Sequence, residues 1–421
     1  MKISKLAAFT FSFFFFVVML AGCTLPIIGG NIPQNPEDND PVANFIYTIV
    51  GTNLSKFFDN FTEINQPNSG EPFYGQDANY EKIQPSYTDN GDETITDNNT
   101  GLMWQKNYTK TTWSNAQSVA DSANTGGYTD WRIPTIKELY SLIDFTGSVG
   151  SGGPDQSVAP PDAVPFINTE YFNFDYADTG RYIDVQYLSN TEYTSDAMNN
   201  PNIVFGVNFA DGHIKGYPTQ TKVFPLLLVR GNTDYGTNDF VDNGDGTITD
   251  KNTGLMWLKY DSGYADFSDE RTGYTKTDGS MNWEEALDFC ENLAFAGYSD
   301  WRLPDAKELH SIVDYSRSPD YTQSAAIDPI FEITQIIDEM NKLDYPAFWS
   351  STTFNNRTNE AIIICFGEAI GYLHGTFLDV HGAGCQRTDS KTGIPSYGDP
   401  APQGDVMRIY NYVRPVRTVS Q

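Results

Sequence analysis

Residues 242–259 read DNGDGTITDKNTGLMWLK, and residues 89–106 read DNGDETITDNNTGLMWQK. The two stretches differ at only three positions. A second pair of blocks follows in the same order, with GYTDWRIPTIKEL at 127–139 and GYSDWRLPDAKEL at 297–309. Two blocks that recur in order, with unequal insertions between them, indicate a duplicated domain rather than a short-period repeat array.

Each copy is expected to contain two helices beside short antiparallel strands. The Asp-Asn-Gly-Asp stretches favour turns, and the apolar residues on either side of Asn-Thr-Gly are typical of short strands. Asn282 and Glu285 have capping-box spacing at the start of one predicted helix, and Asp305 and Glu308 have it at the start of the next. This combination defines an α+β domain. We expect the first copy over 85–232 and the second over 238–421.

The N-terminal residues predict export. A short positive region precedes the apolar run 6–19, and the run is too short for a membrane span. Leu20-Ala-Gly-Cys23 is similar to the lipobox of bacterial lipoproteins, in which the cysteine is lipidated and becomes the first residue. We therefore expect a signal peptide over 1–22, lipidation of Cys23 and a spacer over 23–84. The apolar patch 45–50 and Phe57, Phe58 and Phe61 leave a short docking segment in the middle of the spacer as an alternative. Thr24 follows the cysteine, and by resemblance to enteric sorting this favours the outer membrane in a double-membrane cell.

Composition and motifs exclude several classes of function. The formal net charge is −29, which opposes binding to nucleic acid, sulfated polyanions and anionic lipid surfaces. The four histidines share no motif position and show no metal-binding spacing. The sequence also contains no nucleophile elbow, Walker loop or dinucleotide fingerprint. An enzyme is therefore not expected.

Several spaced motifs resemble the DUF1566 family, also called the C-terminal domain of the Legionella collagen-like adhesin. They are DNGDGT at 242–247, TGLMW at 253–257, DWRLP at 300–304, WSSTT at 349–353 and VRPVR at 413–417. The resemblance implies two tandem extracytoplasmic domains of C-type-lectin-like shape, in a family whose adhesin members bind polysaccharide. The first copy has no counterpart of Trp349 and lacks the pair of arginines that Arg414 and Arg417 form in the second copy, which favours a scaffold role for it.

Apart from Cys23 the chain has three cysteines, so one disulfide and one free thiol are the simplest arrangement in an oxidising compartment. Many relatives carry a cysteine where Pro415 stands. The resemblance therefore implies a Cys365–Cys385 disulfide and leaves Cys290 as a buried thiol on a helix face.

Calcium is the one cofactor that the residues suggest. Asp242, Asp245 and Asp250 are oxygen ligands within one short stretch, but their register does not fit an EF-hand loop. The alternative is a plain Asn-Gly turn. The arginines and glutamates of the Asp-Trp-Arg blocks are expected to serve structure, through helix capping and ion pairing.

The second copy carries a long polar, Gly-rich loop over 371–405, a composition typical of functional or disordered loops. With Trp349 it predicts a ligand surface that combines aromatic stacking with polar contacts. The expected ligand-binding residues are Trp349, His374, Asp379, His381, Arg387 and Asp389.

The function expected is that of a lipid-anchored ligand-binding or adhesion module for a glycan or peptide. The alternatives are a structural envelope protein or complex subunit, and an enzyme built on the same fold.

Overall fold

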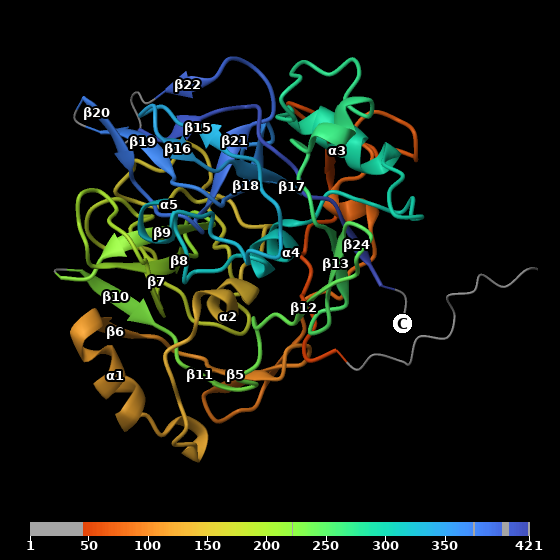
Figure 1. The fold of residues 1–421 in the computed structure, drawn as a ribbon. Coiled ribbons are helices and arrows are strands. Elements are labelled where there is room, and N and C mark those ends of the chain that lie inside the picture. The colour runs from red at the N-terminus through yellow and green to blue at the C-terminus, as the bar shows by residue number, and fades with distance from the viewer. Residues whose placement is uncertain (1–44, 221, 374, 398–403, 420–421) are drawn as a thin grey trace, which may run out of the picture. The chain divides into compact units, whose positions relative to one another are not determined.

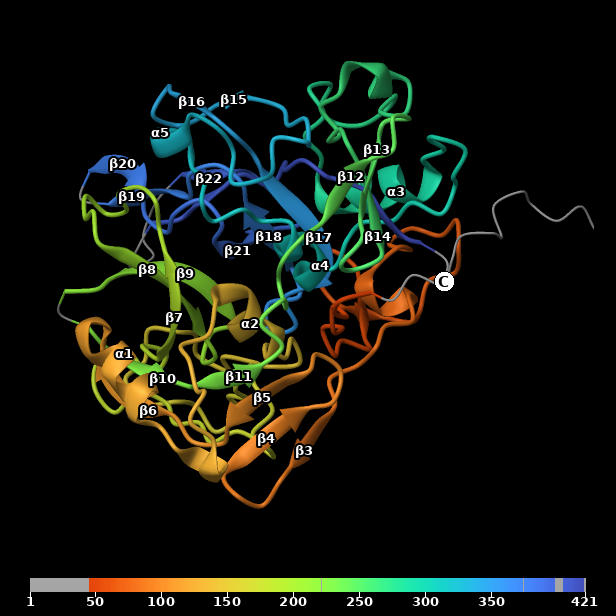
Figure 2. The same cartoon turned by 60° about the horizontal axis from the view of Figure 1, so that its bottom comes forward.

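The computed structural model describes residues 45–220, 222–373, 375–397 and 404–419, all within one unit that spans Ala43–Gln421. Figures 1 and 2 show its elements from two directions. The expected signal peptide and Cys23 lie outside the described residues. Within the described ranges, no helix has the length and apolar character needed to cross a membrane.

The first copy contains a strand hairpin, two helices and a set of antiparallel strands. Its elements are β3 (Tyr87–Asp89), β4 (Thr94–Asp97), β5 (Leu102–Gln105), β6 (Thr109–Thr112), α1 (Trp113–Ser122), the 3-10 turn η2 (Thr125–Gly127), α2 (Ile136–Ser141), β7 (Gln186–Glu192), β8 (Ile203–Asn208), β9 (His213–Pro218), β10 (Val223–Leu226) and β11 (Val229–Gly231).

The second copy repeats this order with additional short elements. It comprises β12 (Phe240–Asp242), β13 (Thr247–Asp250), β14 (Leu255–Leu258), η3 (Ala265–Ser268), α3 (Trp283–Asn292), α4 (Ala306–Ser311), α5 (Pro319–Thr322), β15 (Ile336–Ile337), β16 (Leu343–Asp344), β17 (Ala347–Thr353), β18 (Glu360–Cys365), β19 (Ile370–Leu373), β20 (Thr376–Asp379), β21 (Gln386–Ser390), β22 (Ser396–Tyr397), β23 (Val406–Met407) and β24 (Val416–Thr418). The expectation of helices beside short antiparallel strands in two tandem copies is confirmed.

The quoted repeat forms the same four-stranded sheet in each copy. The strand orders are β11-β5-β4-β3 and β12-β13-β14-β24, and every pairing is antiparallel. Trp104 and Trp257 lie fully buried at equivalent positions. The repeat therefore decides the fold because it places a large indole under each small sheet.

A six-stranded antiparallel sheet runs through both copies. Its order is β17-β18-β21-β9-β8-β7, so three strands come from each copy, and the seam is the pairing of Gln386 with Ile214. In Figure 2, α2 lies beside the green strands of the first copy and α4 lies beside the blue strands of the second. Tyr140 and His310 occupy equivalent positions on these helices, and their ring centroids are 4.4 Å apart.

Equivalent lysines make reciprocal contacts across this junction. Lys137 Nζ donates to the carbonyl of Ser311 at 2.7 Å, and Lys307 Nζ donates to the carbonyl of Ser141 at 2.9 Å. In a two-fold interface each contact occurs twice with the partners exchanged. The two copies are therefore related as an internal pseudo-dimer, with α2 and α4 at its axis.

The second repeated block builds the start of α4. Asp305 accepts hydrogen bonds from the first-turn backbone, and Glu308 reaches back to the Asp305 N–H. Arg302 donates to both oxygens of Glu308, at 2.6 and 2.7 Å. The first copy shows the same arrangement. The expected structural role of these residues is confirmed, since capping and ion pairing use all three side chains.

Residues 45–84, expected as part of the spacer with a short docking segment as the alternative, pack against both copies. They include β1 (Phe57–Phe58), β2 (Glu63–Ile64) and the 3-10 turn η1 (Asp77–Asn79), and their buried side chains include Tyr47, Val50, Leu54 and Phe58. Lys82 Nζ lies 3.0 Å from Asp305 Oδ2 and 2.6 Å from Glu308 Oε1. An abundance of Asn, Pro and Gly favours turns as much as an extended spacer, and the buried aromatic residues favour packing.

Candidate functional site

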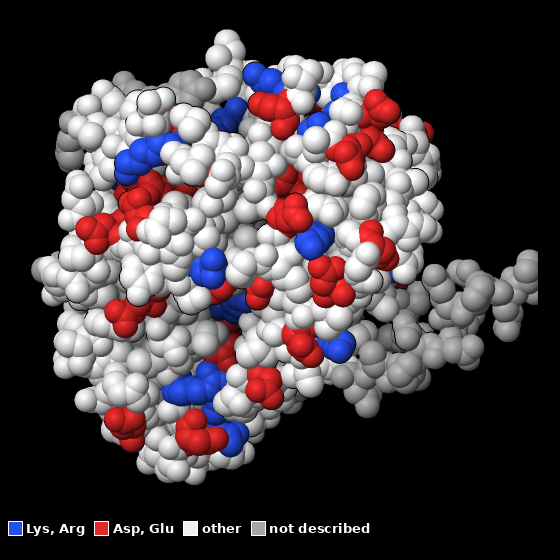
Figure 3. Space-filling view, in the orientation of Figure 1, with Lys and Arg blue, Asp and Glu red and all other residues white. Residues whose placement is uncertain are grey.

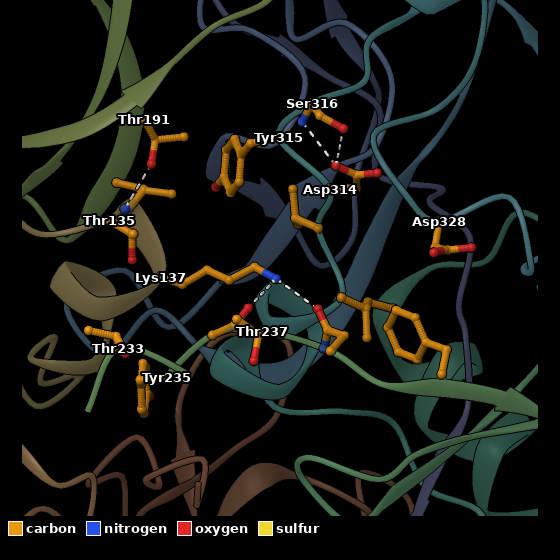
Figure 4. Close-up of a pocket in the computed structure, with 16 residues that line it drawn as sticks. Thr135, Lys137, Thr191, Thr233, Tyr235, Thr237, Asp314, Tyr315, Ser316 and Asp328 are labelled. Carbon is orange, nitrogen blue, oxygen red and sulfur yellow. Dashed lines mark hydrogen bonds between the residues drawn. The ribbon is translucent and has the colours of Figure 1, made fainter. Parts of the chain in front are cut away.

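A cleft of about 470 Å³ opens where the two copies and their linker meet (Figure 4). Four threonines supply hydroxyl groups to its wall, namely Thr135, Thr191, Thr233 and Thr237. Tyr235, Phe240 and Tyr315 add aromatic surface. Pockets of this size that combine apolar surface with a few polar groups are the usual form of a small-ligand site.

Lys137 forms one side of the cleft but has no hydrogen-bonding capacity to spare. Its Nζ donates to the Gly236 carbonyl at 3.1 Å, to Asn238 Oδ1 at 3.0 Å and to the Ser311 carbonyl at 2.7 Å (Figure 4). These contacts use the three donors of an ammonium group. Burial lowers the pKa of Lys137 to about 8. The lysine therefore holds the linker against α2 and does not serve as an anion-binding group.

Thr191 lines the cleft from β7. Its Oγ1 accepts a hydrogen bond from the Ile136 N–H at 3.0 Å, at the start of α2 (Figure 4). A hydroxyl also has one hydrogen to donate. No residue in the described ranges accepts it, so Thr191 offers a donor to a ligand.

The opposite wall is fixed by the turn that follows α4. Asp314 Oδ1 accepts from the Ser316 N–H at 3.0 Å and from its hydroxyl at 2.6 Å. The Tyr315 hydroxyl donates to the Gly384 carbonyl at 2.7 Å. These contacts hold the wall in place.

The predicted stacking residue Trp349 is not on a surface. Its side chain is fully buried, and its Nε1 donates to the Met281 carbonyl at 2.8 Å. A ring enclosed on both faces cannot stack on a ligand, so this prediction is wrong. Trp349 instead belongs to the hydrophobic core that β17 helps to form.

The other predicted ligand-binding residues are directed inward. Asp379 accepts from the Tyr193 hydroxyl at 2.8 Å, and burial raises its pKa to about 6. His381 Nε2 lies 2.8 Å from an Asp405 carboxylate oxygen, and Arg387 bonds the same carboxylate. Burial lowers the pKa of His381 to about 4. His374 lies outside the described residues.

His381, Arg387 and Asp389 do come together, around a cavity of about 20 Å³. Asp389 is held by Asn411 Nδ2 at 2.7 Å. A polar cavity of this size holds roughly one water molecule. The loop therefore forms a buried polar network, which orders the second copy and presents no ligand surface through these residues.

The predicted disulfide is absent, and the three cysteines within the described ranges are free, buried thiols. Cys365 and Cys385 are nonetheless neighbours, since the Cys365 N–H bonds the Cys385 carbonyl at 3.0 Å. Burial raises the pKa of Cys385 well above its usual value. A protonated thiol is a poor nucleophile for disulfide formation. Cys290 is buried on the apolar face of α3, as expected.

The three aspartates of the calcium prediction do not converge on a site. Asp242 is paired with Lys259 at 2.8 Å, and Asp245 accepts from the Thr247 N–H and hydroxyl. Asp250 accepts four hydrogen bonds from the surrounding turn. The described residues contain no group of three His, Cys, Asp or Glu side chains placed to hold a metal. Turn formation therefore accounts for these residues.

A second cleft, of about 390 Å³, lies between residues 69–74 and α3 and is bordered by Glu284, Glu285 and Asp288. Two of these carboxylates are already engaged. Glu285 completes the cap of α3, and Asp288 accepts from the Tyr274 hydroxyl at 2.7 Å. The junction cleft is the stronger candidate because Thr191 has a donor that no neighbour uses.

Sequence reasoning missed the junction cleft because the linker was treated as a boundary. One signal was available, since Gly-Thr-Asn occurs at 51–53 and again at 236–238, both outside the quoted blocks.

Figure 3 shows acidic and basic side chains interspersed on one face of the protein, without a continuous basic field there.

The comparison with protein families finds the same duplication as the structure. The model of the Lcl C-terminal domain matches residues 93–230 and 246–378, which together make up more than half of the chain. The chain belongs to this family. The expected resemblance is therefore confirmed in two tandem copies of the Lcl C-terminal domain. No curated protein and no solved structure matches the chain.

Proposed function

We propose that this chain is a lipid-anchored cell-envelope protein that binds a glycan or peptide ligand in the junction cleft. The Lcl C-terminal domain family, named for an adhesin, supports an adhesion-type module. The predicted signal peptide and the lipobox-like sequence that ends at Cys23 support the lipid anchor, and Thr24 favours the outer membrane in a double-membrane bacterium. A C-type-lectin-like shape of each copy belongs to this proposal and is supported by the two helices beside short antiparallel strands.

The observation that carries the proposal is the unused donor of Thr191 beside a cleft of about 470 Å³. Hydroxyl groups and aromatic rings together suit ligands that carry many hydrogen-bonding groups but little charge. Both copies build the cleft, so the first copy contributes to binding rather than serving only as a scaffold.

The charge of the protein narrows the ligand class. The net charge is −29, and the nearest ammonium group, on Lys137, is already fully bonded. A sulfated polyanion would meet repulsion and find no free cation in this cleft. The ligand we propose is therefore uncharged or weakly charged, and the role is binding without a catalytic step.

The test uses the chain from Thr24 onward, free of the lipid anchor, on arrays of neutral glycans and of peptides. Ligands retained by the parent protein are then measured with Thr191→Val and Asp314→Asn, and with Thr109→Val as a matched control on β6. Loss of binding in the cleft variants and not in the control supports the proposal. Equal binding by all four proteins, or no retained ligand, refutes it.

A further inference from the structure

The open junction cleft has a counterpart on the other side of the pseudo-two-fold axis. Lys137 Nζ donates to the Gly236 carbonyl at 3.1 Å, and Lys307 Nζ donates to the Gly51 carbonyl at the same distance. Both glycines begin a Gly-Thr-Asn tripeptide. Residues 51–53 therefore lie against α4 as residues 236–238 lie against α2.

The strand residues beside the two clefts also correspond. Thr191 Oγ1 accepts from the Ile136 N–H at 3.0 Å, and Thr352 Oγ1 accepts from the Ala306 N–H at 3.0 Å. Each threonine thus supports the first turn of the helix at the axis. The two clefts therefore share a helix lysine, a Gly-Thr-Asn segment and a strand threonine in corresponding places.

The counterpart cleft, beside α4, is filled by the chain itself. Asp77 Oδ2 accepts hydrogen bonds from Thr52 Oγ1 at 2.6 Å and from Thr352 Oγ1 at 2.9 Å. Asp77 is only 5% exposed, and it lies at the start of η1. A few residues later, Lys82 pairs with Asp305 and Glu308. Residues 76–82 therefore occupy the counterpart cleft beside α4 as a short peptide.

The open junction cleft contains the matching hydroxyls without such an occupant. Thr191 and Thr237 stand where Thr352 and Thr52 stand in the filled cleft. Thr191 has no acceptor among the described residues. The Thr237 hydroxyl donates locally to the Asp234 carbonyl at 2.6 Å and accepts from Asn252 Nδ2 at 3.0 Å, so of these two threonines only Thr191 has an unused donor. The linker passes directly from β11 to β12, so it provides no segment comparable to residues 76–82.

We propose that the open cleft binds a peptide segment in the manner of residues 76–82, with an Asp or Asn side-chain oxygen accepting a hydrogen bond from the Thr191 hydroxyl. This inference rests on the proposed function and specifies its ligand. The preference for a peptide follows from the occupant of the equivalent cleft. Asp314 borders the open cleft, so an amide or protonated carboxyl is accommodated better than an anion.

One difference between the clefts gives the proposal a specific consequence. Asp305, which pairs with Lys82 in the filled cleft, is replaced by Thr135 in the open one. A lysine at the corresponding position of a bound peptide therefore lacks this partner. An acid at position 135 would supply it and would keep the capping role, because Asp and Thr both cap helices.

The experiment measures fluorescence anisotropy of a labelled synthetic peptide of residues 74–84 with the chain from Thr24 onward. We expect saturable binding, and the peptide with Asp77→Ala should bind about fivefold more weakly through the lost hydrogen bond. Thr191→Val in the protein should weaken binding by a similar factor, and Thr191→Ser should restore it. Thermal unfolding of each variant checks that the fold is retained.

A gain of affinity provides the second arm. Thr135→Asp should strengthen binding of the native peptide about threefold through the restored ion pair and leave the Lys82→Ala peptide unchanged. Absence of saturable binding, or binding unaffected by Asp77→Ala and by Thr191→Val, overturns the inference. Binding lost in Thr352→Val but retained in Thr191→Val shows exchange into the filled cleft and also overturns it. If a neutral glycan binds in a Thr191-dependent way and the peptide does not, the proposed function stands and this inference fails.

Discussion

The Arg302–Glu308 and Arg132–Glu138 pairs are chemically identical but differ in burial. The Arg302 and Glu308 side chains are 7% and 5% exposed, whereas the Arg132 side chain is 29% exposed. The cost of disturbing an ion pair rises as its charges lose access to water. The two copies therefore offer an internal comparison of the same interaction.

We expect Arg302→Lys to lower the free energy of unfolding by about 2–3 kcal/mol, because lysine cannot bond both carboxylate oxygens of a buried glutamate. Arg132→Lys should cost about 1 kcal/mol or less, since water reaches its guanidinium group. Urea unfolding of both variants measures the difference. Equal losses would show that burial does not set the strength of this pair.

We expect Asp77 to make the free energy of unfolding depend on pH. Burial raises its pKa to about 7, from an ordinary value of 3.8. The folded protein therefore keeps a proton that the unfolded chain has lost between these pH values, and stability falls as pH rises through that window. Asp77→Asn removes this dependence and keeps an oxygen acceptor for the threonines.

The measurement is the unfolding free energy of wild-type protein and Asp77→Asn at pH 4, 5, 6, 7 and 8. The difference should shift in favour of the variant from pH 4 to pH 7, by at most about 1.4 kcal/mol per pH unit, and then level off. A difference that stays constant across the series would mean that Asp77 remains ionised in the folded protein.

At the scale of elements, residues 45–84 allow a packed segment to be distinguished from an extended spacer by mutation. Phe58 is 2% exposed and Phe61 is 66% exposed, although both lie in the same short stretch. We expect Phe58→Ala to lower the free energy of unfolding by about 3 kcal/mol, because it leaves a cavity in the core. Phe61→Ala serves as the matched control and should change little. If neither substitution alters the thermal midpoint, the segment does not contribute to the folded unit.

The elements that sequence predicted well are those governed by local chemistry. The capping boxes at α3 and α4 follow from residue types three positions apart, and such signals need no knowledge of distant contacts. The burial of Trp349 and the inward direction of His381 depend on strands far apart in the chain. Periodicity and composition do not report such contacts, so the sequence predicted an exposed ligand surface where the structure has buried side chains.

For the whole molecule, the shared sheet and the contact between Tyr140 and His310 predict one cooperative unfolding transition. Scanning calorimetry should give a calorimetric enthalpy close to the van't Hoff enthalpy, as for a single two-state unit. The second copy alone, residues 238–421, should fail to give a cooperative transition because the strands at its seam lose their partners. Two resolved transitions in the full chain would instead show that the copies fold independently.

The pseudo-two-fold arrangement has a consequence for how specificity can change. In a homodimer of single domains, every substitution appears in both binding sites, so neither can be altered alone. Joining the two copies in one chain removes that constraint, and here one site is closed by residues 76–82 while its twin remains open. The closed site can then preserve the stability of the pair, and the open site is free to acquire a new ligand.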